Sequence, residues 1–345
     1  MTSQDFKITV SENSPSNIIL WNKLAEKCGN IWQATFYDEV QLFFNNHAWY
    51  FECYNGEELI GGVKIYFYES KKLPAILRSI SKRATQGSEF LFDRGKNEFF
   101  EIFNALLYEK IKKWLEEKKM TSFFEYSFFG ETEKLISLGQ EKKIWESNIG
   151  IAKIDLTKSI KSLWSAVDQT HRGKVIKAEK NKVAIVWSDE IDLFFTLMDE
   201  TYKNQKGHVP NKKFIRYEYE ILKSNNSAQL VFASHEGKYL CGALLYNFGK
   251  ISIYNFAGTI KNNLGAGQLL HWEIIKRLKD KGYQSYFLGE TSFKKNEANL
   301  RFTEGITKFK LRFGADQIPT FHKGYALHPM KLKIWKLLQK IIIRK

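Results

Sequence analysis

Cysteine, proline and long apolar runs are scarce in this sequence, and each scarcity excludes a class of protein. The three cysteines, Cys28, Cys53 and Cys241, stand far apart in a chain of 345 residues. This argues against a disulfide framework and against a cysteine-held zinc site. With five prolines, no proline-rich tail or linker is expected. No run of about 18 apolar residues occurs, so we expect no transmembrane helix.

Acidic side chains are outnumbered, with 38 Asp and Glu against 53 Lys and Arg and a formal net charge of +15. Such a charge attracts anions, including nucleic acid, nucleotides, phospholipid headgroups and sugar phosphates. Because the lysines are spread along the whole chain, a general solubility bias explains the charge equally well. Residues 1–14 lack the basic-then-apolar pattern of a secretory signal, so we expect a cytoplasmic location.

The pattern that is present is an alternation of strands and helices over a length that favours two domains. Apolar spacing predicts helices over residues 17–28, 96–119, 131–138, 160–181, 190–205, 214–224 and 265–281. Strands are predicted over residues 49–54, 59–68, 121–129, 149–155, 183–187, 228–235, 239–248, 250–257 and 283–288. Asn55-Gly56 and Glu236-Gly237 indicate hairpins. Both halves show strand, hairpin, helix and strand, which suggests a weak internal duplication.

The most distinctive local feature is a glycine loop between a predicted strand and a predicted helix. It reads Asn262-Asn263-Leu264-Gly265-Ala266-Gly267-Gln268. Glycines allow close approach of a ligand, and free amides at a helix start bind anions. The loop resembles the pyrophosphate-binding loop of CoA-dependent GNAT acetyltransferases, with Asn262 where that pattern has Arg or Gln. We therefore assign donor binding to Asn262, Gly265, Ala266, Gly267 and Gln268.

Three further motifs resemble the FemABX family of peptidoglycan-bridge aminoacyltransferases. The carboxyl-terminal half has Leu270-His271-Trp272, then Leu288-Gly289-Glu290, then Gly305-Ile306 with Phe309-Lys310 and Phe313-Gly314. Upstream, the segment from Trp164 to Asn181 resembles the lysine-rich helix of that family, with His171 and Val175 as departures. Glu290 replaces a glycine often found there. The likeness spans roughly residues 20 to 320 and is more specific in the second half.

The resemblance implies an α+β fold of two tandem GNAT-like domains, each a mixed, mostly antiparallel sheet flanked by helices. We place the first domain at residues 1–147, the second, with the donor site, at 148–327, and a basic amphipathic helix at 328–345. It also implies transfer of an aminoacyl group from charged tRNA to an amine of a peptidoglycan or surface-glycan precursor. Phe309 and Lys310 would then lie beside the donor ester, where Lys310 could stabilise an oxyanion. The alternative interpretation of Lys310 is a surface lysine on a strand, with no catalytic role.

The proton that leaves the incoming amine needs a base, and the sequence offers three candidates. Glu290 stands at a strand end near the glycine loop, and Tyr254 lies in the preceding strand. Glu125 lies in an apolar strand of the first domain, where burial would raise its pKa. His271 is interpreted as a packing or helix-face residue.

Basic residues of the lysine-rich helix are candidates for binding the acceptor or its phosphates. Lys177 and Lys180 are neighbours on one helix face, and Arg172 could hold a phosphate with two bonds. A solvated helix face explains the same pattern. No metal-binding motif, catalytic triad or phosphate-binding Gly-Lys-Ser loop is present, so we expect neither metal nor tightly bound cofactor.

The last residues, 328–345, have an apolar stripe of Leu332, Trp335, Leu338 and Ile342 among lysines. This pattern is typical of a helix that lies on anionic lipid; docking on the protein body is the alternative. We keep two other functions open: an acyl-CoA-dependent N-acyltransferase of an amino or nucleotide sugar, and a non-catalytic RNA- or membrane-binding module.

Overall fold

The computed structural model describes residues 6–128, 142–203, 210–293 and 304–342. The chain forms two compact units, the first of residues 1–148 with 320–345 and the second of residues 149–319. The stretch 320–327, which the sequence analysis placed in the second domain, therefore clusters with the first unit. The chain passes between the units along β7 (Lys143–Asp155) and β13 (Asp316–Ala326).

The first unit is a mixed, mostly antiparallel sheet in the order β1-β2-β3-β4-β6-β13. Its strands besides β13 are β1 (Phe6–Glu12), β2 (Asn46–Asn55), β3 (Glu58–Tyr68), β4 (Arg83–Gln86), β5 (Leu91–Phe92), which pairs with β3, and β6 (Ser122–Tyr126). Its helices are α1 (Ile18–Cys28), η2 (Ile31–Gln33), α2 (Tyr37–Leu42), η3 (Ala75–Ser81), η4 (Arg94–Phe99), α3 (Phe100–Glu117) and α10 (Pro329–Ile342). The apolar side of α3 packs on the sheet, with Phe103, Leu107 and Ile111 fully buried.

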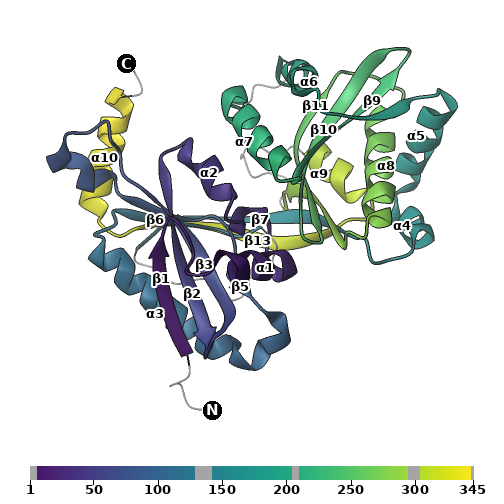
Figure 1. Cartoon of the computed structure of the whole chain (residues 1–345). Helices are drawn as coiled ribbons and strands as arrows, with labels where there is room; N and C mark the ends of the chain where they lie inside the picture. The colour runs from purple at the N-terminus through teal and green to yellow at the C-terminus, as the bar shows by residue number, and fades with distance from the viewer. Residues whose placement is uncertain (1–5, 129–141, 204–209, 294–303, 343–345) are drawn as a thin grey trace. The chain divides into compact units, whose positions relative to one another are not determined.

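The second unit repeats this plan in the order β7-β12-β11-β10-β9-β8. Its strands besides β7 are β8 (Ala184–Ser188), β9 (Ala228–His235), β10 (Lys238–Phe248), β11 (Ile251–Thr259) and β12 (Ser285–Thr291). Its helices are α4 (Ile160–Ala166), α5 (Gln169–Lys180), α6 (Ile191–Lys203), α7 (Lys212–Ser224), α8 (Ala266–Asp280) and α9 (Glu304–Leu311). Helices α5 and α8 cover one face of the sheet, and α6 and α7 cover the other (Figure 1).

Each sheet contains one parallel pair among antiparallel ones, and in each unit a long helix joins the two parallel strands. In the first unit α3 joins β4 to β6, and in the second unit α8 joins β11 to β12. A parallel connection needs such a crossover. The internal duplication suggested by the sequence is therefore a duplication of topology.

One predicted helix is divided in the structure. The predicted helix over 160–181 is two helices, because Val167 and Asp168 are extended (ψ 130° and 143°) and the Asp168 side chain caps α5. Lys310, for which a strand was the alternative, lies on α9. The predicted helix over 131–138 falls outside the described residues.

Candidate active site

The second unit opens between its two parallel strands. Strands β11 and β12 pair only over Ile251–Ile253 with Ser285–Phe287, although both continue beyond. Just past this ladder each strand has an irregular register with its other neighbour, between Leu244 and Leu245 in the β10 pairing and between Phe287 and Gly289 in the β7 pairing. Because such bulges bend a strand locally, the two strands part at this point.

The Lys310 amine reaches this opening from α9. Its Nζ donates a hydrogen bond to the backbone carbonyl of Glu290 at 2.8 Å. Gly289 has a φ of +82°, and a Cβ there would lie 3.3 Å from Lys310 Nζ and 3.6 Å from the Tyr254 carbonyl oxygen. The amine therefore lies where β11 and β12 diverge. Gly289 belongs to the Leu288-Gly289-Glu290 motif of the sequence. The structure shows that its missing side chain leaves room for the Lys310 amine.

Burial changes the acid–base behaviour of Lys310. The side chain is only 9% exposed, and desolvation lowers its pKa from the usual 10.5 to about 8, with the Glu290 charge acting in the opposite direction. A lysine with this pKa is still mostly protonated at pH 7, so it carries a positive charge in a poorly solvated site. Such a charge stabilises a developing oxyanion much more strongly than a lysine in water does.

Two histidines and two phenylalanines pack beneath this lysine. The ring of His271 lies 5.5 Å from that of Phe309 and 5.1 Å from that of Phe313. His171 lies 4.7 Å from Phe313, and its Nε2 contacts the Phe309 carbonyl at 3.1 Å. A carbonyl only accepts, so His171 donates this bond, and it thereby ties the last turn of α9, next to Lys310, to α5.

His271 is neutral in this setting. It is 2% exposed, and its Nδ1 shares a 2.9 Å hydrogen bond with the Tyr286 hydroxyl. Burial, followed by the charges of Lys310 and His171, lowers its pKa to about 3. The sequence interpretation of His271 as a packing residue agrees with this environment.

The candidate bases behave differently from one another. The Tyr254 ring packs against His271 at 4.6 Å, and burial, with smaller contributions from Cys241 and Tyr202, raises the pKa of its hydroxyl. Tyr254 therefore stays protonated at neutral pH and is a hydrogen-bond donor. Glu290 is half-buried at the opening. Glu125 lies in the first unit, buried beside Tyr325.

The predicted donor loop packs closely against α5 at Gly265. Gly265 has a φ of +81°, and a Cβ there would lie 2.3 Å from the Lys174 carbonyl oxygen of α5. Gly265, Ala266 and Gln268 are buried. The Asn262 side chain is bonded within its own loop, to the Ile260 carbonyl and the Leu264 amide. Gly267 is the member nearest the Lys310 helix, 3.9 Å from the Phe309 ring by its Cβ position.

The basic residues of α5 divide into two kinds. Arg172 Nη1 donates to the carbonyl oxygens of Ser165 at 3.0 Å and Val167 at 2.8 Å, at the carboxyl end of α4. This guanidinium nitrogen is therefore occupied by the protein's own backbone. Lys177 and Lys180 are exposed. Exposure is expected both for a phosphate-binding face and for a solvated helix face, so it does not choose between them.

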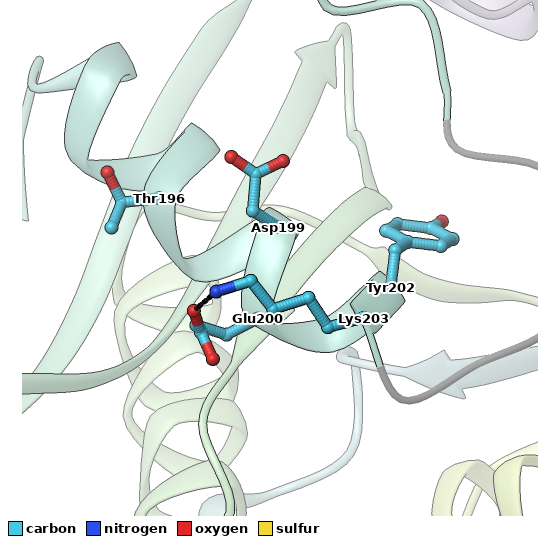
Figure 2. A pocket seen from close by; sticks show the side chains of 5 residues that line it. All are labelled: Thr196, Asp199, Glu200, Tyr202 and Lys203. Atoms are coloured by element: carbon cyan, nitrogen blue, oxygen red, sulfur yellow. Dashed lines mark hydrogen bonds and ion pairs between the residues drawn. The ribbon is translucent and has the colours of Figure 1, made fainter.

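A hollow at the carboxyl end of α6 is lined by Thr196, Asp199, Glu200, Tyr202 and Lys203 (Figure 2). Glu200 and Lys203 pair with each other, and Asp199 pairs with Lys212 at 2.5 Å. Its link with the site is Tyr202, which lies near enough to Tyr254 to raise the pKa of that hydroxyl. Nothing in the local sequence pattern singled out Tyr202.

Two absences concern the described residues alone. No helix within them is long and apolar enough to cross a bilayer. No group of three His, Cys, Asp or Glu side chains in that part of the chain could hold a metal ion.

Residues 166–296, which include Tyr254, His271 and Glu290 but not Lys310, match the family described as acetyltransferase (GNAT) domain. Comparison with curated proteins found no match in sequence. Among solved structures, FemX is similar over 94% of this chain and 99% of its own, with a TM-score of 0.71 and 15% identity.

Two further solved structures are similar over most of this chain. The carboxyl-terminal domain of a putative lysylphosphatidylglycerol synthetase from Agrobacterium fabrum covers 92% of this chain and 94% of its own, with a TM-score of 0.55 and 12% identity. L-PGS from Bacillus licheniformis is similar over 96% of this chain and 98% of its own, with a TM-score of 0.54 and 13% identity. The chain thus has the FemX-like fold of tandem GNAT-type domains that its sequence motifs indicated.

Proposed function

We propose that this acyltransferase-fold protein transfers an aminoacyl group to an amine of a cell-envelope precursor, a peptidoglycan or surface-glycan intermediate. The observation that carries the proposal is the buried Lys310 amine, held by the Glu290 carbonyl where β11 and β12 part. It supplies a fixed positive charge at a place where an ester carbonyl could enter between two strands.

The proposed reaction is an aminolysis of an ester. The acceptor amine attacks the ester carbonyl, a carbon–nitrogen bond forms, and the carbonyl oxygen becomes an oxyanion beside protonated Lys310. Collapse breaks the bond to the departing oxygen of the donor, which takes up a proton, while the amine loses one. Glu290 is our candidate to receive the amine proton, with the Tyr254 hydroxyl as a hydrogen-bond donor at the same opening.

For the donor we favour aminoacyl-tRNA over acyl-CoA. A Cβ on Gly265 would lie 2.3 Å from the Lys174 carbonyl oxygen, so α5 packs closely against this loop, and Asn262 is engaged within its own loop. Both features leave a CoA pyrophosphate less room than an open glycine loop would. The net charge of +15 suits an RNA donor. Acyl-CoA is the second candidate, favoured by the acetyltransferase family match of residues 166–296.

An anionic acceptor would suit the exposed lysines of α5, Lys177 and Lys180. We place the protein in the cytoplasm, with a peripheral contact to the inner face of the membrane through α10. Such a contact would bring the enzyme to lipid-linked acceptors. Both assignments are proposals that accompany the transferase function.

The first test is acyl transfer by Lys310→Met. We expect turnover to fall by about 100-fold or more, the loss typical of removing one oxyanion donor. Transfer to an amine acceptor would be measured with charged tRNA and with acetyl-CoA as donors. Lys308→Met is the matched control, because Lys308 lies on the same helix, is exposed and pairs with Glu304 at 2.6 Å.

The control should keep wild-type turnover. Full turnover of Lys310→Met would refute the role of this lysine. Transfer from acetyl-CoA but not from charged tRNA would replace the aminoacyl donor by the second candidate. A folded protein that transfers from neither donor would refute the proposed function.

A further inference from the structure

Two elements far apart in sequence form one surface on the first unit. The short helix η3 (Ala75–Ser81) packs beside α10 (Pro329–Ile342) (Figure 1). At the tip of the η3 segment, Ile76 is 86% exposed and Leu77 is 42% exposed. An aliphatic side chain this exposed costs free energy in water, so the tip is a candidate contact surface.

Helix α10 presents an apolar stripe to the outside as well as one to the protein. Leu332, from the stripe singled out in the sequence, is buried at 7% exposure. At Leu332 this stripe therefore packs against the protein. Its buried side chain is not available for contact with a membrane. Met330, Ile334 and Leu337 are 75%, 46% and 56% exposed. Their i, i+4, i+7 spacing places them on one side of the helix.

The charged residues within the two segments are all basic. Residues 70–81 contain Lys71, Lys72 and Arg78, and residues 329–342 contain Lys331, Lys333, Lys336 and Lys340. Neither segment contains an Asp or a Glu. Lys333, Lys336 and Lys340 form the stripe next to the exposed apolar one, so aliphatic tips and ammonium groups alternate across the same surface.

This combination fits one partner chemistry. A second copy of the chain would oppose two surfaces whose charges are all positive, which disfavours self-association. A phosphate backbone alone would use the cations but leave Ile76 and Met330 in water. An anionic bilayer offers phosphates to the lysines and acyl chains to the aliphatic residues at once.

We infer that η3, with Lys71 and Lys72 in the segment before it, and the outer stripe of α10 together form a docking surface for anionic lipid, which we call the η3–α10 surface. Its residues are Lys71, Lys72, Ile76, Leu77, Met330, Lys333, Ile334, Lys336, Leu337 and Lys340. The inference rests on the proposed peripheral membrane contact and specifies its surface. The buried stripe of α10 serves to hold that helix on the first unit.

The test is co-sedimentation of the full chain with vesicles of phosphatidylcholine alone or with phosphatidylglycerol added. We expect binding only to the anionic vesicles. Lys72→Gln with Lys333→Gln should weaken it by roughly 30-fold, since each lysine near such a surface contributes about 1 kcal/mol. Ile76→Ser with Met330→Ser should weaken it by about tenfold or more by removing inserted aliphatic groups.

Matched controls come from other surfaces of the same unit. Lys7→Gln with Lys23→Gln removes two exposed lysines, and Ile19→Ser removes an aliphatic residue that is 79% exposed on α1. Both controls should bind like the wild type, and all variants should melt at the wild-type temperature.

The outcomes separate the inference from the proposed function. Binding to anionic vesicles that none of the η3–α10 variants weakens would overturn this surface and keep a membrane contact elsewhere. No binding to anionic vesicles would overturn the membrane contact, while amine acylation by the same preparation would still stand. Binding of an RNA oligomer that the same variants weaken more than vesicle binding would replace lipid by RNA as the partner.

Discussion

At the scale of single residues, Lys310 has an environment unlike that of an ordinary lysine in water. The motif placed it beside the donor, but the sequence could not say whether it was buried. The structure buries it at 9% exposure and bonds it to a backbone carbonyl. Desolvation then lowers its pKa to about 8, which brings its titration into an accessible range.

This value predicts an alkaline loss of activity. The protonated form of Lys310 stabilises the oxyanion, so kcat/KM should fall as the pH rises through about 8. A pH profile of kcat/KM with a non-titrating acceptor analogue would measure the limb. In Lys310→Arg, the guanidinium stays charged. The alkaline fall in kcat/KM should therefore move to higher pH, however low the activity of this variant is. An unchanged limb in that variant would assign it to another group.

At the scale of elements, the corner between α4 and α5 shows how tertiary contacts divide a continuous helical pattern. The Asp168 amide donates to the Arg312 carbonyl at 2.8 Å, and its side chain caps the amide of Thr170 at 2.9 Å. A Cβ on Gly314 would lie 2.6 Å from the Cβ of Ala166, so only glycine fits there. No glycine or proline marks this break in the sequence, because its cause lies about 145 residues away along the chain.

The same corner yields a prediction for Arg172. Because its guanidinium holds the end of α4, Arg172→Met should lower the free energy of unfolding by about 1–2 kcal/mol. Urea unfolding followed by circular dichroism would measure the loss, with the exposed Lys177→Met as the control. An unchanged stability together with a raised acceptor KM would instead support the phosphate-binding role that the sequence suggested.

At the scale of the whole molecule, the buried histidines make the second unit sensitive to acid. His271 has a pKa of about 3 in the folded chain against 6.5 for an ordinary histidine. Between these values the unfolded chain binds the proton that the folded chain refuses. Stability is therefore lost as the pH falls from 6.5 towards 3, with a slope of about 1.4 kcal/mol per pH unit for one such group.

Replacing the histidine should flatten that dependence. In His271→Phe we expect a lower stability at pH 7, because the Tyr286 hydroxyl loses its partner, but a shallower fall between pH 6.5 and 4. Urea midpoints measured across this range give the slope directly. His235→Gln, at the partly exposed end of β9, should keep the wild-type slope. A wild-type slope in His271→Phe would show that other groups cause the acid loss.

The sequence by itself determined the alternation of elements, the two hairpins, the stripe of α8 and the FemX-like motifs. Each of these depends on neighbours within one element or on short-range turn chemistry, which periodicity records. In the helix predicted over residues 265–281, Leu269, Ile275 and Leu278 are all buried, as its apolar spacing requires. Lys310 and Glu290 were named from motif positions, and their side chain and backbone carbonyl meet where β11 and β12 part.

Only the tertiary structure decided what depends on packing between distant segments. It turned Arg172 towards its own backbone, covered Gly265 with the Lys174 carbonyl, and joined His171 to the helix of Lys310. It also decided which stripe of α10 faces outward and placed η3 beside it. Apolar spacing shows that a helix has a buried side, but when both sides carry aliphatic residues, the contacts with the rest of the unit determine which side is buried.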